Sequence, residues 1–190
     1  MTHIIRSLIL GIAPALLGSL LALPGMAQLV EDPSGFPPPA ESQPASQKLP
    51  AAELNKWPPS QQPVELVLYL SERQLYVYRG ETIEKAYPVA VGKSGWETPT
   101  GTFEVSYMLE NPGWTNPFTG AVMPPGPDNP LGERWIAFWT DGHNEIGFHG
   151  TPNQTSIGQA ASHGCVRMHN EHIRELYDLV APGTLVTVLP

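Results

Sequence analysis

The chain has 190 residues, with 10 Lys and Arg against 18 Asp and Glu, so its formal net charge is −8 at pH 7. This acidity argues against binding to nucleic acids or anionic lipids, because both depend on clustered Lys and Arg, and the sequence has no such cluster. Its single cysteine, Cys165, excludes an internal disulfide. Outside the cytosol a lone thiol risks oxidation and mispairing, so in an exported protein it would need a function.

The N-terminal segment is typical of an export signal. Arg6 precedes an uncharged run, 7–23, and small residues lead to a cleavage position after Ala27. An uncleaved membrane anchor is also conceivable, but the run is short for a bilayer span and Pro14 interrupts it. We therefore predict that 1–27 is a signal peptide, that no stable membrane span persists after its cleavage, and that the protein is exported to the periplasm or cell envelope.

Residues 28–62 are predicted to be a linker. Prolines recur along it, with Ser, Gln and Ala between them; they are Pro33, Pro37, Pro38, Pro39, Pro44, Pro50, Pro58 and Pro59. Such a segment cannot bury enough apolar surface to offset the entropy lost on ordering, so we expect a mobile tether without helix or strand. Residues 63–190 are then a single domain, long enough to bury a sizeable core.

Short apolar or alternating segments predict a mainly β domain. The candidate strands are 64–70, 74–78, 82–91, 102–107, 135–139, 145–148 and 184–189. The first three are separated by short turns and should form an antiparallel meander.

One helix and one long loop complete this organisation. Asn170 is a suitable cap for a helix whose apolar residues recur on one face and which ends at Pro182-Gly183. The Pro-, Gly- and Asn-rich stretch 111–132 is long for a compact domain, and such loops are usually lids or binding loops. Trp114 and Phe118 within it could contact a substrate or hold the loop on the core.

Two segments, Ile146–Thr151 and Ser162–Met168, contain the residues that suggest chemistry. A thiol is a good nucleophile as the thiolate, and an imidazole near Cys165 could take its proton and hold an ion pair. Each histidine could instead be structural, His149 as a polar residue at a strand end and His163 through a hydrogen bond to its loop. One Cys and two His also suit zinc, so the residues alone leave both chemistries open.

The residues around Cys165 fit nucleophilic chemistry. The amides of Gly164 and Cys165 could hold the oxyanion that forms when a thiolate attacks a carbonyl. Arg167 lies two residues from Cys165 and would share its face in an extended segment. It could hold a carboxylate by a two-pronged contact, or it could pair with Glu171.

The sequence resembles a known catalytic family. His149-Gly150-Thr151, a spacer and Ser162-His163-Gly164-Cys165-Val166-Arg167-Met168 resemble the signature of the L,D-transpeptidase catalytic domain, the YkuD family. Thr98–Phe103 and Asn129–Gly132 resemble further parts of it. The resemblance covers nearly all of 63–190. It implies a β-sandwich of mixed sheets with one or two short helices, and no cofactor or metal.

The resemblance also implies residue roles. Cys165 would attack the carbonyl of a peptidoglycan stem peptide and form a thioester. His149 would be the general base, with its ring oriented by the main-chain carbonyl of Gly150. Four more residues would have supporting roles. His163 and Gly164 would help to form the oxyanion site, and Ser162 and Arg167 would contact the substrate.

The reaction's outcome stays open at this level. The implied donor bond joins the L-centre of a diamino acid to a terminal D-alanine, and the acceptor is a second stem peptide or a lipoprotein lysine. If water reaches the thioester instead, the protein is an L,D-carboxypeptidase. A non-catalytic peptidoglycan-binding module is a further possibility, which intact His149 and Cys165 argue against, and so is a zinc protein using Cys165, His149 and His163. The sequence does not decide the oligomeric state.

Overall fold

The computed structural model describes residues 50–54 and 56–190. The predicted signal peptide, 1–27, and the predicted linker up to residue 49 lie outside the described residues. In the rest of the predicted linker the chain forms two helical turns, α1 (Ala51–Leu54) and η1 (Pro59–Gln61), where we expected none. Pro59 can begin η1 because the first residue of a helix has no use for its N–H. Within the described ranges no helix is long and apolar enough to cross a membrane.

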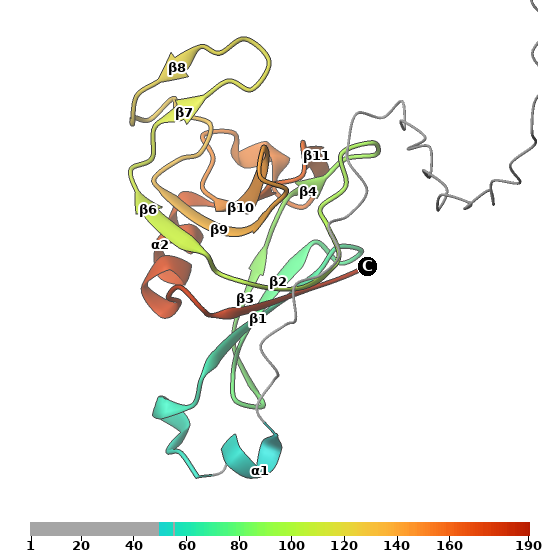
Figure 1. Cartoon of the computed structure of the whole chain (residues 1–190), viewed down its shortest axis with the longest axis vertical. Coiled ribbons are helices and arrows are strands. Elements are labelled where there is room, and N and C mark those ends of the chain that lie inside the picture. Colours follow the sequence, from blue (N-terminus) through green and yellow to red (C-terminus); the bar gives the residue numbers. More distant parts are fainter. Residues whose placement is uncertain (1–49, 55) are drawn as a thin grey trace, which may run out of the picture. The chain divides into compact units, whose positions relative to one another are not determined.

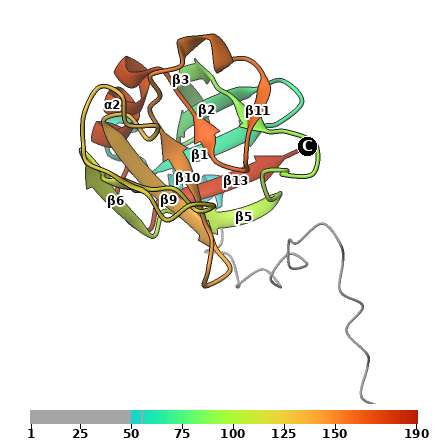
Figure 2. The same cartoon turned by 90° about the horizontal axis from the view of Figure 1, so that it is seen from above.

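A five-stranded sheet contains the first and the last strand of the domain. Its strands are β1 (Val64–Tyr69), β2 (Gln74–Arg79), β3 (Thr82–Pro88), β5 (Gly101–Glu104) and β13 (Leu185–Leu189). Their order is β3-β2-β1-β13-β5 (Figures 1 and 2). β1, β2 and β3 form the predicted antiparallel meander, whereas β13 pairs parallel to β1.

A four-stranded sheet packs against the first. Its strands are β6 (Tyr107–Glu110), β9 (Arg134–Thr140), β10 (Glu145–His149) and β12 (Val166–Arg167). Their order is β12-β10-β9-β6, with β10 parallel to β12 and antiparallel to β9. Apolar side chains of both sheets share one core; from the first they include Leu66, Leu68, Val77 and Val186, and from the second Ile136, Phe138, Phe148 and Val166. The prediction of a mainly β fold with mixed sheets is confirmed.

Shorter elements complete the fold. They are the paired strands β4 (Val91–Gly92) and β11 (Ala160–Ser162), the hairpin β7 (Trp114–Thr115) and β8 (Val122–Met123), the 3-10 helix η2 (Gln154–Ser156) and the helix α2 (Asn170–Leu179). α2 is the predicted helix, and it buries Ile173 and Leu176. His169 precedes it with extended backbone, so Asn170 is its first residue and not its cap.

Two predicted strands are each divided between sheets. The segment 82–91 ends as β3 at Pro88 and resumes as β4 beside β11. The segment 102–107 ends as β5 at Glu104, and β6 begins at Tyr107 in the other sheet. Between them the amide of Val105 donates to Thr184 and that of Ser106 donates to Ala137, so the backbone changes partners within two residues.

Candidate active site

One face of the four-stranded sheet collects the candidate residues. Across the strands, Leu109, Trp135, His149 and Arg167 align in one row. Because side chains alternate between faces, this row faces away from the core that contains Phe148 and Val166.

A second row on this face lies beside Cys165. Tyr107, Ala137 and Gly147 align across β6, β9 and β10. Cys165 immediately precedes β12, two residues before Arg167, so it lies beside Gly147 on the side that carries His149. The register of the parallel strands β10 and β12 therefore places Cys165 next to Gly147, two residues before His149.

His149 is held rigidly. Its side chain is only 4% exposed, its Nδ1 lies 2.6 Å from the carbonyl oxygen of Gly150, and the Trp135 ring is tilted against it with centroids 5.9 Å apart. A proton on Nδ1 donates to that carbonyl and leaves Nε2 as the nitrogen that can accept a proton. Burial lowers the pKa of His149 to about 4, against the opposing hydrogen bonds to Gly150 and Pro130, and the charge of Arg167 lowers it further. The ring is therefore neutral at pH 7.

Cys165 is neutral at the same pH. Its Sγ donates to the carbonyl oxygen of Glu145 over 3.6 Å. Burial raises the pKa of the thiol to about 11, although the backbone amide of Gly147 and the charge of Arg167 favour the thiolate. The carboxylate of Glu145 raises the pKa further.

The shifted pKa values favour a neutral thiol and a neutral imidazole over a thiolate–imidazolium ion pair. A thiol with a pKa near 11 beside an imidazole with a pKa near 4 keeps its proton at neutral pH. The physical reason is that both groups are desolvated, which penalises the charged form of each.

This state predicts slow alkylation. Below its pKa, the rate of Cys165 alkylation by iodoacetamide should rise about tenfold per pH unit up to about pH 10, because the thiolate is the reactive form. At pH 7.4 we expect a rate roughly 10²-fold below that of the same thiol in the denatured chain, whose pKa is about 8.5. Rates measured by mass spectrometry across pH test this, with the chain in denaturant as control. A plateau already reached by pH 8 would contradict it.

A buried hydroxyl holds the loop before Cys165. Ser162 is 1% exposed, its Oγ donates to the carbonyl oxygen of Cys165 over 2.5 Å, and it accepts from the amide of Gly164 over 3.1 Å. The Oγ1 of Thr98 donates to the carbonyl oxygen of Gly164 over 2.7 Å. Gly164 has φ +109°, a backbone conformation that side chains of L residues rarely adopt, so a larger residue there would be strained.

These contacts involve two of the residues with predicted roles. Ser162, expected to touch substrate, is enclosed within the loop. The amide of Gly164, expected to face an oxyanion, donates to Ser162.

His163 contacts two aromatic rings and not the buried pair. It is exposed, and its ring contacts Trp96 and Phe118 with centroids 4.8 and 5.7 Å apart. Phe118, 65% exposed, lies in the β7–β8 hairpin, which extends from β6 (Figure 1). Asn129 ties the long loop together by donating to the carbonyl oxygens of Pro112 and Pro124. The long loop thus contacts the candidate site through aromatic rings.

Arg167 has an available guanidinium. Its backbone pairs with Ala90, but its side chain makes no hydrogen bond or ion pair with any described residue, and the pairing with Glu171 is not formed there. Its charge lowers the pKa of His149, His163 and Cys165, so it is the cation common to all three.

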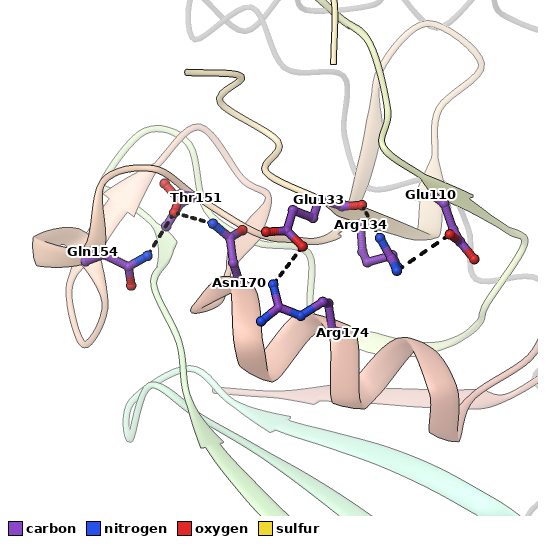
Figure 3. A network of polar contacts seen from close by, with 7 residues as sticks. All are labelled: Glu110, Glu133, Arg134, Thr151, Gln154, Asn170 and Arg174. Atoms are coloured by element: carbon purple, nitrogen blue, oxygen red, sulfur yellow. Dashed lines mark hydrogen bonds and ion pairs between the residues drawn. The ribbon is translucent and has the colours of Figure 1, made fainter. Parts of the chain in front are cut away.

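The start of α2 holds Thr151, which follows the Gly150 carbonyl that orients His149 (Figure 3). Asn170 donates to the carbonyl oxygen of Thr151 over 3.4 Å, and Gln154 donates to the same oxygen over 3.2 Å. A Cβ at Gly150 would lie 2.0 Å from the Oδ1 of Asn170, and one at Gly132 would lie 2.3 Å from it. Gly132 is required here, because its Cβ would also lie 2.7 Å from the Gly150 backbone, whereas a Cβ at Gly150 would displace the Asn170 side chain.

The sequence did not reveal three neighbours of the pair. Trp135 contacts His149, Tyr107 bonds to Glu145, and Glu145 faces Cys165. Trp135 could have been found from the alternation of β9, which places it on the side opposite to the buried Ile136. Glu145 and Tyr107 are brought together only by sheet pairing.

Comparisons with known proteins identify the family of the chain. The family model of the L,D-transpeptidase catalytic domain, YkuD, matches residues 63–188. A Bacillus licheniformis protein named "Putative L,D-transpeptidase YkuD" is 35% identical over 128 residues, which cover 67% of this chain and 67% of that protein. The chain belongs to the YkuD family of L,D-transpeptidase catalytic domains.

Solved structures show the same fold. An L,D-transpeptidase from Mycobacterium tuberculosis H37Rv has a TM-score of 0.56 at 19% identity, covering 67% of this chain and 57% of that one. An L,D-transpeptidase solved with imipenem has a TM-score of 0.54 at 19% identity, covering 66% of this chain and 58% of that one. The chain thus spans less than two thirds of the length of these solved proteins.

Proposed function

We propose that this protein is an exported L,D-transpeptidase that acts on peptidoglycan stem peptides, with Cys165 as nucleophile. The observation that supports it most is the placement of Cys165 and His149 on one face of neighbouring strands, with His149 fixed through Nδ1 to the Gly150 carbonyl. This is the arrangement that cysteine–histidine acyl transfer needs.

In the first half-reaction Cys165 forms the acyl-enzyme. The thiol proton passes to Nε2 of His149 as Sγ attacks the carbonyl of the donor peptide. When the tetrahedral intermediate collapses, the carbon–nitrogen bond breaks, His149 returns the proton to the departing amine of D-alanine, and a thioester remains. A base that is neutral at pH 7 suits both transfers.

The surrounding residues support this step in different ways. We propose that the oxyanion is held by the loop 163–165, with the amide of Cys165 as the main donor because that of Gly164 is used by Ser162. Ser162 then positions the loop, and His163 lines the site with Trp96 and Phe118. Arg167, without a partner among the described side chains, is proposed to hold a carboxylate of the donor.

In the second half-reaction an amine resolves the thioester. The uncharged amine attacks the carbonyl, the carbon–sulfur bond breaks, and the amine proton passes through His149 to Sγ. The product is a new amide cross-link, and the role is cell-wall remodelling outside the cytoplasm. L,D-carboxypeptidase activity is the same chemistry with water as acceptor, and product analysis with and without an acceptor amine separates the two.

A β-lactam tests the nucleophile without any assumption about the acceptor. Since a relative has been solved with imipenem, we expect imipenem to acylate this protein as well. The intact mass should increase by one drug molecule in the wild type and should not change in Cys165→Ala. Equal adduct yields on both proteins would place the reaction at another residue.

A further inference from the structure

A carboxylate stands beside the proposed nucleophile. Glu145 begins β10, its carbonyl oxygen accepts the Cys165 thiol, and its side chain lies on the same face as Gly147 and His149. The side chain is exposed. It makes no ion pair within the ranges 50–54 and 56–190, so its negative charge there is uncompensated.

Tyr107 fixes this carboxylate in place. Its hydroxyl donates to Oε2 of Glu145 over 2.6 Å. Tyr107 thus holds one oxygen of the carboxylate, and Oε1 of Glu145 accepts no hydrogen bond from a described residue and is left for another donor.

Charges of opposite sign flank the thiol. Arg167 pairs in register with His149 at the end of β10, whereas Glu145 stands at its start. An anion at Glu145 opposes formation of the thiolate and so works against the first half-reaction. A favourable effect of this carboxylate would therefore lie in the second half-reaction. The reactant that enters there is the acceptor amine, which is a cation at neutral pH.

We propose that Glu145, positioned by Tyr107, binds the ammonium group of the acceptor beside the thioester at Cys165. This rests on the proposed transpeptidase function and defines the acceptor as a primary amine that arrives charged. The bound ammonium releases one proton to solvent and leaves the carboxylate as the free amine to attack; its second proton follows the route through His149. Glu145 is unchanged at the end of the cycle.

The test separates the half-reactions. The full chain is acylated with a stem tetrapeptide, and the thioester is resolved by L-lysine, which is cationic at pH 7, or by hydroxylamine, which is uncharged. Glu145→Gln should raise the KM for lysine about tenfold, because it removes one charge-assisted hydrogen bond to the ammonium group. The KM for hydroxylamine should not change. It should also speed alkylation of Cys165, because a negative charge is removed.

Two variants serve as comparisons. Tyr107→Phe keeps the ring but frees the carboxylate, so it should raise the lysine KM by a smaller factor. Glu110→Gln removes an exposed acid from the same sheet, on the other face, and should match the wild type. An unchanged lysine KM in Glu145→Gln, or equal losses with both acceptors, overturns the inference. Failure of the wild type to form the thioester would instead overturn the proposed function.

Discussion

Replacing Cys165 by alanine should abolish acyl transfer and leave the fold intact. The side chain is small and partly buried beside β10, and its thiol makes one weak hydrogen bond, to Glu145. Stability should change by no more than about 1 kcal/mol. Activity on a stem tetrapeptide should fall below detection, because no other residue can form the thioester.

Serine at the same position should be nearly as inactive. A hydroxyl is much harder to ionise than a thiol, and burial that raises the pKa of Cys165 would act on serine in the same direction. Turnover is measured by chromatography of the released D-alanine and cross-linked products, with thermal unfolding as the control for folding. Wild-type turnover in Cys165→Ala would contradict the assignment of the nucleophile.

Replacing His149 by alanine should reduce acylation by roughly 10²-fold or more at pH 7, since general-base catalysis contributes that much. The thiol cannot rely on its own ionisation, because its pKa is raised to about 11. The usual contribution of an imidazole, a lowered thiol pKa, is not expected here. His149→Ala should therefore leave alkylation of Cys165 at high pH close to wild type while acylation at pH 7 is lost.

His163→Ala provides the matched comparison. His163 is exposed and packs on Trp96 and Phe118. Its loss should lower the acylation rate by about tenfold or less, because these two rings would be held less firmly beside the site. Acylation rates with imipenem and with a stem tetrapeptide, followed from pH 5 to 10, measure both variants. A larger loss in His163→Ala than in His149→Ala would reverse the two roles and leave the reaction class unchanged.

Local patterns in the sequence predicted much of the fold. Alternation and short turns identified the meander of β1, β2 and β3, and the apolar spacing after Asn170 identified α2. The crossings at Val105 and between Pro88 and Val91 were not predictable, because a strand that changes sheets keeps the same alternation. The β7–β8 hairpin was hidden by its prolines and glycines.

The candidate site was predictable as a motif but not as an electrostatic environment. The His-Gly and Ser-His-Gly-Cys segments indicate Cys165 and His149 as candidates without any coordinates. The neutral state of the pair depends on burial, and the carboxylate of Glu145 comes from pairing across β6, β9 and β10. Ser162 looked like a substrate contact because it lies in the motif, yet its two hydrogen bonds close the loop.

Mass spectrometry of the wild-type protein incubated with disaccharide tetrapeptides tests the central claim most directly. We expect an adduct on Cys165 equal to the substrate minus D-alanine, located by peptide mapping, followed by cross-linked dimers as the adduct decays. The adduct should be missing in Cys165→Ala. Dimers formed without a Cys165 adduct, or an adduct that maps to another residue, would contradict the account.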